Sequence, residues 1–280
     1  MRRALVLGGG GVAGIAWELG VLKGLYDAGL DLTTADRVVG TSAGSAVAAQ
    51  VLSGTPLNDL YARQLSSDLL VSEIAAEFDP QVMMREFGAA LTGAKPGRPT
   101  YRKLGEYSLR AKTVDEPVRR AVIERRLPNR NWPDRDLRII AIDANSGEPR
   151  TFTNADGVEL VDAVAASCAV PGIWPPVTIG DSRYIDGGMR STINLDLAAG
   201  CDPVIVISPT LMSVLPAADV DLAEELVRTT ASVVTIIANE ASMEAIGLNP
   251  LDPATARPAA LAGRAQAAAH VEQVKAVWGT

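Results

Sequence analysis

The clearest candidate for chemistry is Ser42, which lies in the stretch Gly40-Thr41-Ser42-Ala43-Gly44. An apolar pair, Val38-Val39, precedes this Gly-x-Ser-x-Gly pattern, and residues 45–52 after it are compatible with a helix. A tight strand-to-helix turn of this kind exposes the serine hydroxyl, and small flanking residues let the strand and the helix approach closely. Ser42 is therefore a candidate nucleophile. The alternative is an ordinary Gly/Ser turn that caps a core helix.

A second candidate is the glycine run at residues 8–11, which Gly14 extends. It follows the apolar segment Ala4-Leu5-Val6-Leu7 and precedes a helical pattern that includes Ile15 and Leu19. Consecutive glycines can direct several backbone N–H groups toward one anion. The loop is a candidate site for a phosphate or for the oxyanion of a reacting ester, with a purely structural glycine turn as the alternative.

The same loop also fits Gly-x-Gly-x-x-Gly at Gly9, Gly11 and Gly14, the pattern of a dinucleotide-binding loop. That function requires an acidic residue at the end of the second strand, where it binds the ribose. Here the second expected strand, residues 37–39, leads directly into Gly40-Thr41-Ser42. The sequence therefore disfavours a nucleotide, and we expect no organic cofactor.

The general base must be found in a chain that has one histidine. His270 lies in an alanine-rich segment, residues 265–277, which predicts a terminal surface helix far in sequence from the glycine motifs. Asp186 follows the short apolar pair Tyr184-Ile185 and precedes Gly187-Gly188. A carboxylate in a glycine turn is commonly structural. Without a histidine, however, a carboxylate hydrogen-bonded to the serine is the simplest remaining base.

Composition limits the other functions. The 280 residues are 48% hydrophobic and 21% charged, which is ordinary for a globular protein, and they are long enough for a single α/β domain over residues 1–280. A net charge of −7 disfavours nucleic acid as a partner. Cys168 and Cys201 have no metal-binding or redox spacing, so we expect two buried thiols and no metal.

No stretch of the sequence reaches the roughly 18 to 20 apolar residues that span a bilayer. Residues 4–7 fit a first strand better than a signal peptide, because glycines interrupt the apolar run after four residues. We therefore expect a cytoplasmic protein whose contact with a membrane, if it makes any, is local and apolar.

Other elements must position the candidate residues. We expect buried strands at residues 137–143 and 203–208, a returning hairpin strand at 150–153, a helix at 113–127, a helical insertion at 56–107 and closing helices over 219–280. The insertion is either a lid or wall for a substrate, or a set of simple packing helices. The arginines of the helix at 113–127 are expected on a solvated face, and they are Arg119, Arg120, Arg125 and Arg126.

Together, the glycine loop, the Ser42 motif and Asp186-Gly187-Gly188 resemble the patatin-like phospholipase family in order and spacing. Residues 166–171, residues 175–177 and Asn194 are also similar to that family. The resemblance covers about residues 4–208, except for the helical insertion. It implies a three-layer α/β/α sandwich with a mainly parallel central sheet, which agrees with the order of strands and helices expected from the sequence.

The resemblance also implies a mechanism, a dyad of Ser42 and Asp186 without histidine. Asp186 would accept the Ser42 proton, and amides of Gly9, Gly10 and Gly11, with Ala43, would stabilise the oxyanion. The expected substrate is a lipid or another acyl ester, cleaved through a covalent acyl-enzyme. The rival hypothesis is a protein of the same fold that binds acyl chains or anionic head groups without turnover.

The glycine loop departs from the family at one position. Many relatives carry Arg or Lys just before the last glycine of the loop, where this chain has Ala13. The missing cation implies weaker anion stabilisation or an altered preference for phosphorylated head groups. An acyl hydrolase is therefore a firmer expectation than a phospholipase.

Overall fold

Eight strands form one mixed sheet in the computed structural model, which describes residues 2–67, 73–74, 76, 80–93, 95, 97–212 and 218–279. The strands are β1 (Ala4–Leu7), β2 (Arg37–Gly40), β3 (Asp136–Asp143), β4 (Pro149–Phe152), β5 (Val177–Ile179), β6 (Ser182–Asp186), β7 (Val204–Ser208) and β8 (Val233–Ile237). Their order is β5-β6-β3-β2-β1-β7-β8, with β4 also paired to β3. The strands from β3 to β8 in this order are parallel, whereas β4, β5 and β6 form antiparallel pairs.

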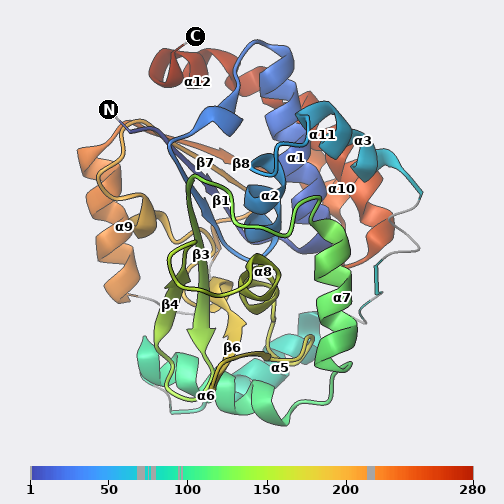
Figure 1. The fold of residues 1–280 in the computed structure, drawn as a ribbon, viewed down its shortest axis with the longest axis vertical. Helices are drawn as coiled ribbons and strands as arrows, with labels where there is room; N and C mark the ends of the chain where they lie inside the picture. Colours follow the sequence, from blue (N-terminus) through green and yellow to red (C-terminus); the bar gives the residue numbers. More distant parts are fainter. Residues whose placement is uncertain are drawn as a thin grey trace.

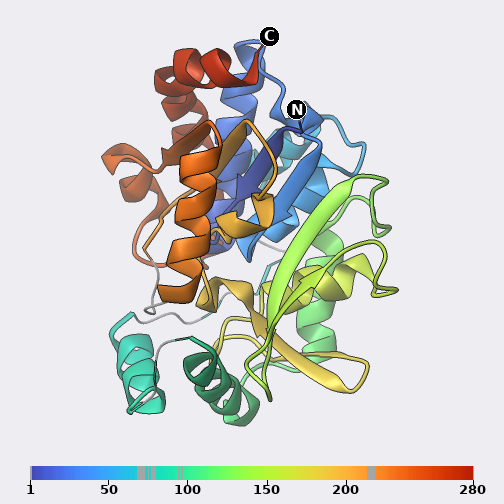
Figure 2. The ribbon, with the colours of Figure 1, turned by 90° about the vertical axis from the view of Figure 1, so that its left-hand side faces the viewer.

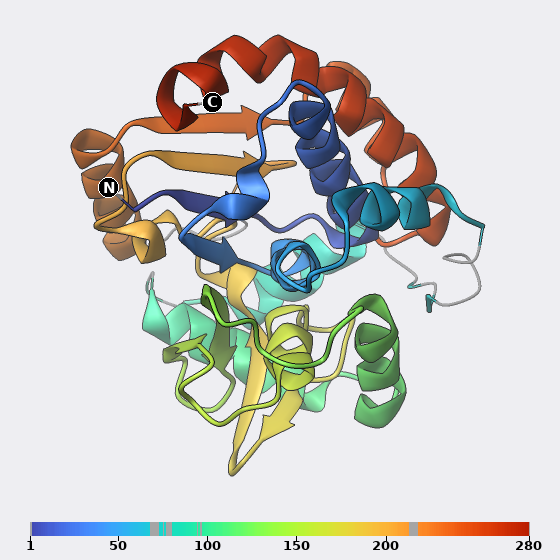
Figure 3. The ribbon, with the colours of Figure 1, turned by 45° about the horizontal axis from the view of Figure 1, so that its top comes forward.

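Helices cover both faces of this sheet (Figures 1 and 3). The described α-helices are α1 (Gly11–Asp27), α2 (Ala43–Val51), α3 (Leu57–Leu65), α5 (Pro80–Ala90), α6 (Arg98–Arg110), α7 (Glu116–Arg126), α8 (Leu160–Ser167), α9 (Ala218–Thr230), α10 (Glu240–Ile246), α11 (Ala256–Ala267) and α12 (Val271–Trp278). The described 3-10 turns are η1 (Leu32–Thr34), η2 (Gly187–Met189), η3 (Leu195–Ala198), η4 (Pro253–Thr255) and η5 (Ala268–His270).

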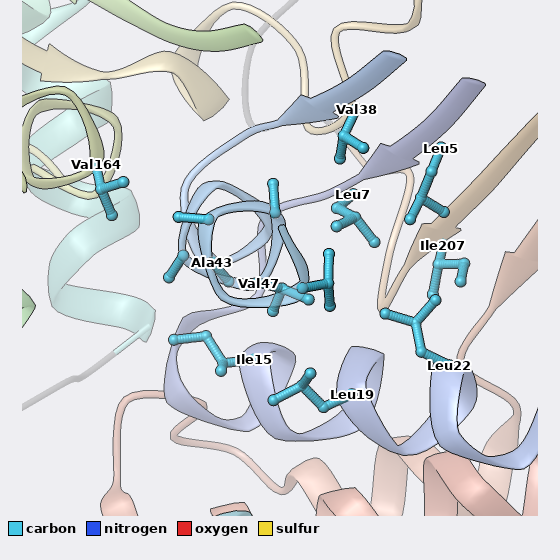
Figure 4. Packing of buried hydrophobic residues seen from close by; sticks show 14 of the residues in the cluster. Leu5, Leu7, Ile15, Leu19, Leu22, Val38, Ala43, Val47, Val164 and Ile207 are labelled. Carbon is cyan, nitrogen blue, oxygen red and sulfur yellow. The ribbon is translucent and has the colours of Figure 1, made fainter. Parts of the chain in front are cut away.

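Alternate residues of the central strands point to opposite helical layers. Leu5 and Leu7 of β1 belong to the core that contains α1, α2 and α11, and Figure 4 shows them on the same side of the sheet as Leu22 of α1. Val6, between them, belongs to a second core with η3 and with Val227 of α9. Strands that are buried on both faces need no polar side, which explains the continuous apolar runs. The three-layer sandwich with a mainly parallel sheet is confirmed.

The register of the sheet brings Ser42 and Asp186 to the same level. Gly40 of β2 pairs with Ile139 of β3, and Ala141, two residues further along β3, pairs with Asp186 of β6. Neighbouring strands advance by nearly the same distance per residue. Asp186 is therefore level with the residue that comes two positions after Gly40 in the chain. That residue is Ser42. Both line one cavity with Phe87 of α5, and α5 and α6 lie at the end of the molecule away from the chain termini (Figures 1 and 2).

The helical insertion expected at residues 56–107 divides into two parts. Helix α3 packs beside α1 and α11, whereas α5 and α6 pack at the end of β3 and β6. Phe87 of α5 and Leu104 of α6 are buried there against Ile185 of β6. Part of the expected apolar pattern, residues 68–72, 75 and 77–79, lies outside the described residues. Whether α5 moves as a lid stays a prediction.

The expectation of helices throughout residues 219–280 is wrong at Val233–Ile237. This segment is β8, which pairs in parallel with β7 at the edge of the sheet. Its five residues are all β-branched, and Val234 and Ile236 are buried while their neighbours are partly exposed. That composition and alternation favour a strand, and they outweigh the helical spacing of apolar residues around it.

Among the described residues, no helix is long and apolar enough to cross a bilayer.

Gly44 provides a test of the close approach between α2 and β1. A Cβ atom at Gly44 would collide with the Leu7 carbonyl oxygen, a backbone atom of the central strand. We expect Gly44→Ala to lower the free energy of unfolding by at least about 2 kcal/mol in urea denaturation, because strand or helix must shift. The matched control is Gly88→Ala in α5, where a Cβ meets nothing within 4 Å. It should leave stability unchanged or raise it by up to about 1 kcal/mol. Equal stability of Gly44→Ala and wild type would contradict this account.

Candidate active site

Ser42 lies between the end of β2 and the first residue of α2, in a conformation that few residues adopt. Its φ is 52° and its ψ is −118°. Such a backbone costs on the order of 1 to 3 kcal/mol and persists only where neighbouring groups enforce it. Here the Ser42 N–H donates to Ser167 Oγ at 2.9 Å, and the Ser42 carbonyl accepts from Ser45 Oγ at 2.7 Å. The turn therefore holds the Ser42 side chain outward, as expected for a nucleophile elbow.

The Ser42 hydroxyl donates to Asp186 Oδ2 at 2.7 Å. The other carboxyl oxygen of Asp186 accepts the Gly188 N–H, also at 2.7 Å. Asp186 is 1% exposed, and this burial raises the pKa of its carboxyl to about 7, although the two hydrogen bonds oppose the rise. A carboxyl with that pKa exchanges a proton near neutral pH, which suits a general base.

Asn194 connects the loop of Ser42 to the loop of Asp186. This buried side chain has a left-handed backbone, with φ 48°, and donates to Thr41 Oγ1 at 3.1 Å and to the Ser191 carbonyl at 2.7 Å. It also approaches the Gly187 carbonyl at 3.4 Å. Asn194 thus fixes residues next to both members of the pair. Spacing alone gave no signal for it, whereas the family resemblance did.

Two side chains of the stretch 166–171 form hydrogen bonds with the backbone of Ser42. Besides Ser167, the Cys168 thiol donates to the Ser42 carbonyl at 3.1 Å. Burial raises the pKa of the Cys168 thiol to about 11, with Arg126 opposing the rise, so the thiol stays protonated and can donate. The expectation that Cys168 and Cys201 are buried free thiols is confirmed. Cys168, however, also positions the candidate nucleophile.

The glycine loop passes beside Ser42, because a Cβ at Gly9 would lie 3.7 Å from the Ser42 Cβ. The Gly9 N–H donates to the Thr192 carbonyl at 3.0 Å and is therefore occupied. The N–H groups of Gly10, Gly11 and Ala43 have no acceptor among the described residues. Of the four expected oxyanion donors, these three have an N–H available for a ligand.

Glu18 of α1 anchors the beginning of the loop, which the sequence reasoning did not anticipate. Its Oε1 accepts the Gly8 N–H at 2.9 Å, and its side chain is fully buried. Burial raises the pKa of Glu18 well above its ordinary value, and the hydrogen bond from the Gly8 N–H opposes only part of this rise. An acidic residue on the apolar face of the first helix was the available signal.

An apolar cavity of about 190 Å³ opens over Ser42 and Asp186. Its walls come from the glycine loop, from α5 and from the segments that follow α8, β6, β7 and α10. The apolar lining residues are Met83, Phe87, Val170, Ile173, Met189, Met212 and Leu251. A site with one polar end and apolar walls fits a ligand that has a polar reacting group and a hydrocarbon chain.

His270 does not belong to this site. It lies on η5, half-buried, with its ring nitrogen 3.5 Å from the Gln266 amide, and it does not line the cavity over Ser42. Among the described residues, no group of three His, Cys, Asp or Glu side chains is arranged to hold a metal ion.

Comparison with known proteins identifies the family. The sequence profile of the patatin-like phospholipase family matches residues 5–199, which include the glycine loop, Ser42 and Asp186. The chain belongs to the patatin-like phospholipase family. No curated protein matches the sequence significantly.

Comparison with solved structures finds two similar chains, of which VipD shares the fold. VipD from Legionella pneumophila superposes with a TM-score of 0.50 at 14% identity, over 97% of this chain and 67% of VipD. The type III effector protein ExoU gives a TM-score of 0.42 at 15% identity, over 97% of this chain and 53% of ExoU. At 14% identity the likeness to VipD concerns the fold alone.

The position that is often basic in the patatin-like family holds a buried alanine here. Ala13 is fully buried in the first turn of α1, and its N–H donates to the Pro250 carbonyl at 2.9 Å. The glycine loop of this patatin-like chain therefore supplies neither a side-chain cation nor a free amide at residue 13.

The expectation that the arginines of residues 113–127 form a solvated face is wrong for two of them. Arg119 and Arg126 of α7 are 5% and 9% exposed. The side chain of Arg126 forms a bidentate ion pair with Glu73, from Nε to Oε1 and from Nη2 to Oε2, both at 2.6 Å. The helix turns these two residues inward, toward the side of α8 and the Ser42 loop, while Arg120 pairs at the surface with Glu159 and Asp162.

The raised pKa of Asp186 predicts a pH-dependent stability. Because the folded pKa of about 7 exceeds the unfolded value of about 3.9, the native state holds the Asp186 proton more tightly, and the contribution of Asp186 to wild-type stability falls as pH rises from about 4 to 7. Asp186→Asn does not titrate. Its stability relative to wild type should rise across this window, by about 4 kcal/mol at most, in denaturant titrations at pH 4.5 and pH 8.

Asp156 supplies the control of opposite sign. Burial alone would raise the pKa of Asp156, but hydrogen bonds from Thr153 and the charge of Arg150 hold it below its usual range. Asp156→Asn should therefore lose stability relative to wild type as pH rises toward about 5, around and below the unfolded pKa of about 3.9, and should stay nearly constant from there to pH 8. Parallel curves for Asp186→Asn and wild type would show that the Asp186 pKa is ordinary.

Proposed function

We propose that this protein hydrolyses fatty-acyl esters of lipids, with Ser42 as the nucleophile and Asp186 as the general base. Membership of the patatin-like phospholipase family supports a lipid acyl hydrolase. The observation that carries the finer assignment is the 2.7 Å hydrogen bond from Ser42 Oγ to a buried carboxyl whose pKa is about 7. It is a ready path for the proton that the attacking hydroxyl must lose.

In the first step, Ser42 Oγ transfers its proton to Asp186 Oδ2 and bonds to the ester carbonyl carbon. The carbonyl oxygen becomes an oxyanion, which the free N–H groups of Gly10, Gly11 and Ala43 are suited to stabilise. One such donor typically lowers the activation barrier by on the order of 3 kcal/mol. The tetrahedral intermediate then collapses, the Asp186 proton passes to the departing alcohol oxygen, and an acyl ester remains on Ser42.

In the second step, a water molecule gives its proton to Asp186 and bonds to the acyl carbon. The C–O bond to Ser42 breaks, Ser42 Oγ regains the proton from Asp186, and the fatty acid leaves. The acyl chain lies in the apolar cavity of about 190 Å³ throughout, with Met83 and Phe87 of α5 as one wall. Neither step draws on a cofactor.

Exposed apolar side chains around this cavity support transient contact with a lipid surface. Met212 lines the cavity and is 82% exposed, and Leu248 is 90% exposed two residues before Pro250, which also lines it. Met84, next to the lining residue Met83, is 59% exposed. Exposed apolar side chains on three segments that line the same cavity fit an enzyme whose substrate is drawn from a membrane or micelle.

The dyad is tested by intact-protein mass spectrometry after treatment with a fluorophosphonate. Wild type should gain one adduct, Ser42→Ala none, and Asp186→Asn an adduct at a rate lowered by roughly 10²- to 10⁴-fold. The wild-type rate should rise as pH increases through about 7, because only ionised Asp186 accepts the proton. Asp181→Asn, an exposed carboxyl before the same strand, is the matched control and should label like wild type. A folded wild type without an adduct would favour the non-catalytic binding protein.

The surface contact is tested with vesicles. Met84→Ser with Leu248→Ser, at two exposed apolar side chains that do not line the cavity, should reduce hydrolysis of a long-chain phospholipid in phosphatidylcholine vesicles by about tenfold or more, because less apolar area enters the interface. Hydrolysis of a soluble short-chain p-nitrophenyl ester should change by less than about twofold. Leu261→Ser, on α11, is the control. Equal losses on both substrates would place the effect in the cavity rather than at the membrane.

A further inference from the structure

A second, smaller cavity also borders Ser42. Its volume is about 40 Å³, and Gly11, Ser42, Val170 and Leu251 line both cavities. The small cavity differs in its other walls, which include the buried guanidinium groups of Arg119 and Arg126. A space of this size holds a few water molecules or a small polyatomic ion, and it is too small for an acyl chain.

The two arginines share one carboxylate. Arg126 occupies both oxygens of Glu73, and the closest approach of Arg119 is a single contact of 4.0 Å from Nη1 to Glu73 Oε2. Among the described residues the cluster thus has two positive charges and one negative charge. The Arg119 side chain is 7% exposed, and its Nε and Nη1 atoms are buried without a hydrogen-bond acceptor among the described residues. Buried hydrogen-bond donors are almost always paired. Since no described residue accepts from these two N–H groups, a ligand is a candidate acceptor.

The ring of Trp174 holds the Arg119 guanidinium in place. The guanidinium carbon lies 3.7 Å from the ring centroid. Stacking of this kind uses the face of the guanidinium and leaves its N–H groups, which lie in its plane, available for an oxyanion. Burial and the charge of Arg126 lower the pKa of Arg119 to about 9, so the group is still a cation at neutral pH.

We propose that Arg119 binds the phosphate group of a phosphorylated lipid substrate in the small cavity, while the acyl chain occupies the large one. This inference rests on the proposed function, because the two cavities meet at Ser42, where the scissile ester would lie. The glycine loop, residues 8–14, contains no cation, so recognition of the phosphate would pass to α7. The substrate class would then be glycerophospholipids and lysophospholipids rather than neutral acylglycerols.

The test uses two substrates that differ only in the phosphate, 1-acylglycerol 3-phosphate and the 1-acylglycerol with the same chain. Each is presented at the same mole fraction in neutral detergent micelles. Arg119→Gln should lower kcat/KM for the phosphorylated substrate by roughly 10- to 100-fold, the range of one charge-assisted hydrogen-bonding group, and change it for the neutral substrate by less than about twofold. Arg119→Lys should recover part of the loss.

Arg130→Gln is the matched control, since it removes one positive charge from a side chain that is 65% exposed beyond α7. It should leave the ratio of the two activities unchanged. Arg119→Gln should also unfold at the same temperature as wild type or a higher one, because it removes the like charge beside Arg126 and leaves the pair with Glu73 intact. Equal losses on both substrates, or no loss on either, would overturn the proposal.

Binding without turnover separates this inference from the proposed function. Glycerol 3-phosphate at millimolar concentration should raise the unfolding temperature of wild type but not of Arg119→Gln, and glycerol should raise neither. A shift in a protein that hydrolyses neither ester would retain the phosphate site and reject the hydrolase. The absence of a shift would overturn the phosphate site. An equal shift with inorganic phosphate, with no preference between the two esters, would indicate a free-anion site and overturn the lipid assignment.

Discussion

Burial of the Asp186 carboxyl against Ser42 is the constraint on which the site depends. In water a carboxylate is a weak base, with a pKa near 3.9. Near-complete burial with only two hydrogen-bond donors, Ser42 and Gly188, raises that pKa to about 7. Further donors would lower the pKa again, and loss of the two donors would keep the acid protonated. The fold must exclude water and still deliver two donors.

The sheet and three loops meet this requirement together. The register of β2, β3 and β6 sets Ser42 and Asp186 at one height, and Asn194 ties the loops that carry them. The strained backbone of Ser42 is balanced by hydrogen bonds at both its N–H and its carbonyl. The close fit of Gly44 against β1 fixes α2 behind the serine. Apart from the Ser45–Ser42 and Asn194–Gly187 bonds, these contacts join segments far apart in sequence, so the site forms only when the sheet has formed.

Local patterns predicted the parts of this structure that local physics determines. The glycine motifs, the strand that ends at Val39 and the single histidine together pointed to Ser42 and Asp186, because each motif limits what the backbone can do. The strand β8 was missed because a short β-branched run lies between two helices with similar apolar spacing. The buried positions of Glu18, Arg119 and Arg126 were missed because charge at a helical position normally indicates solvent, and only tertiary packing reverses that rule.

The buried charged side chains differ in how they tolerate burial. Glu18 can become neutral by protonation, and burial shifts its pKa upward, in the direction that favours the neutral acid. Arg126 is balanced by Glu73 at two oxygens. Arg119 is neither neutral nor closely paired. Its pKa of about 9 keeps it charged near neutral pH, and both oxygens of Glu73 already accept from Arg126, so Arg119 approaches Glu73 only to 4.0 Å. A cation held in that state by Trp174, next to the serine, costs stability that a purely structural residue could avoid, since an apolar side chain of similar size would pack without the charge. An anion that arrives with the substrate would remove this cost.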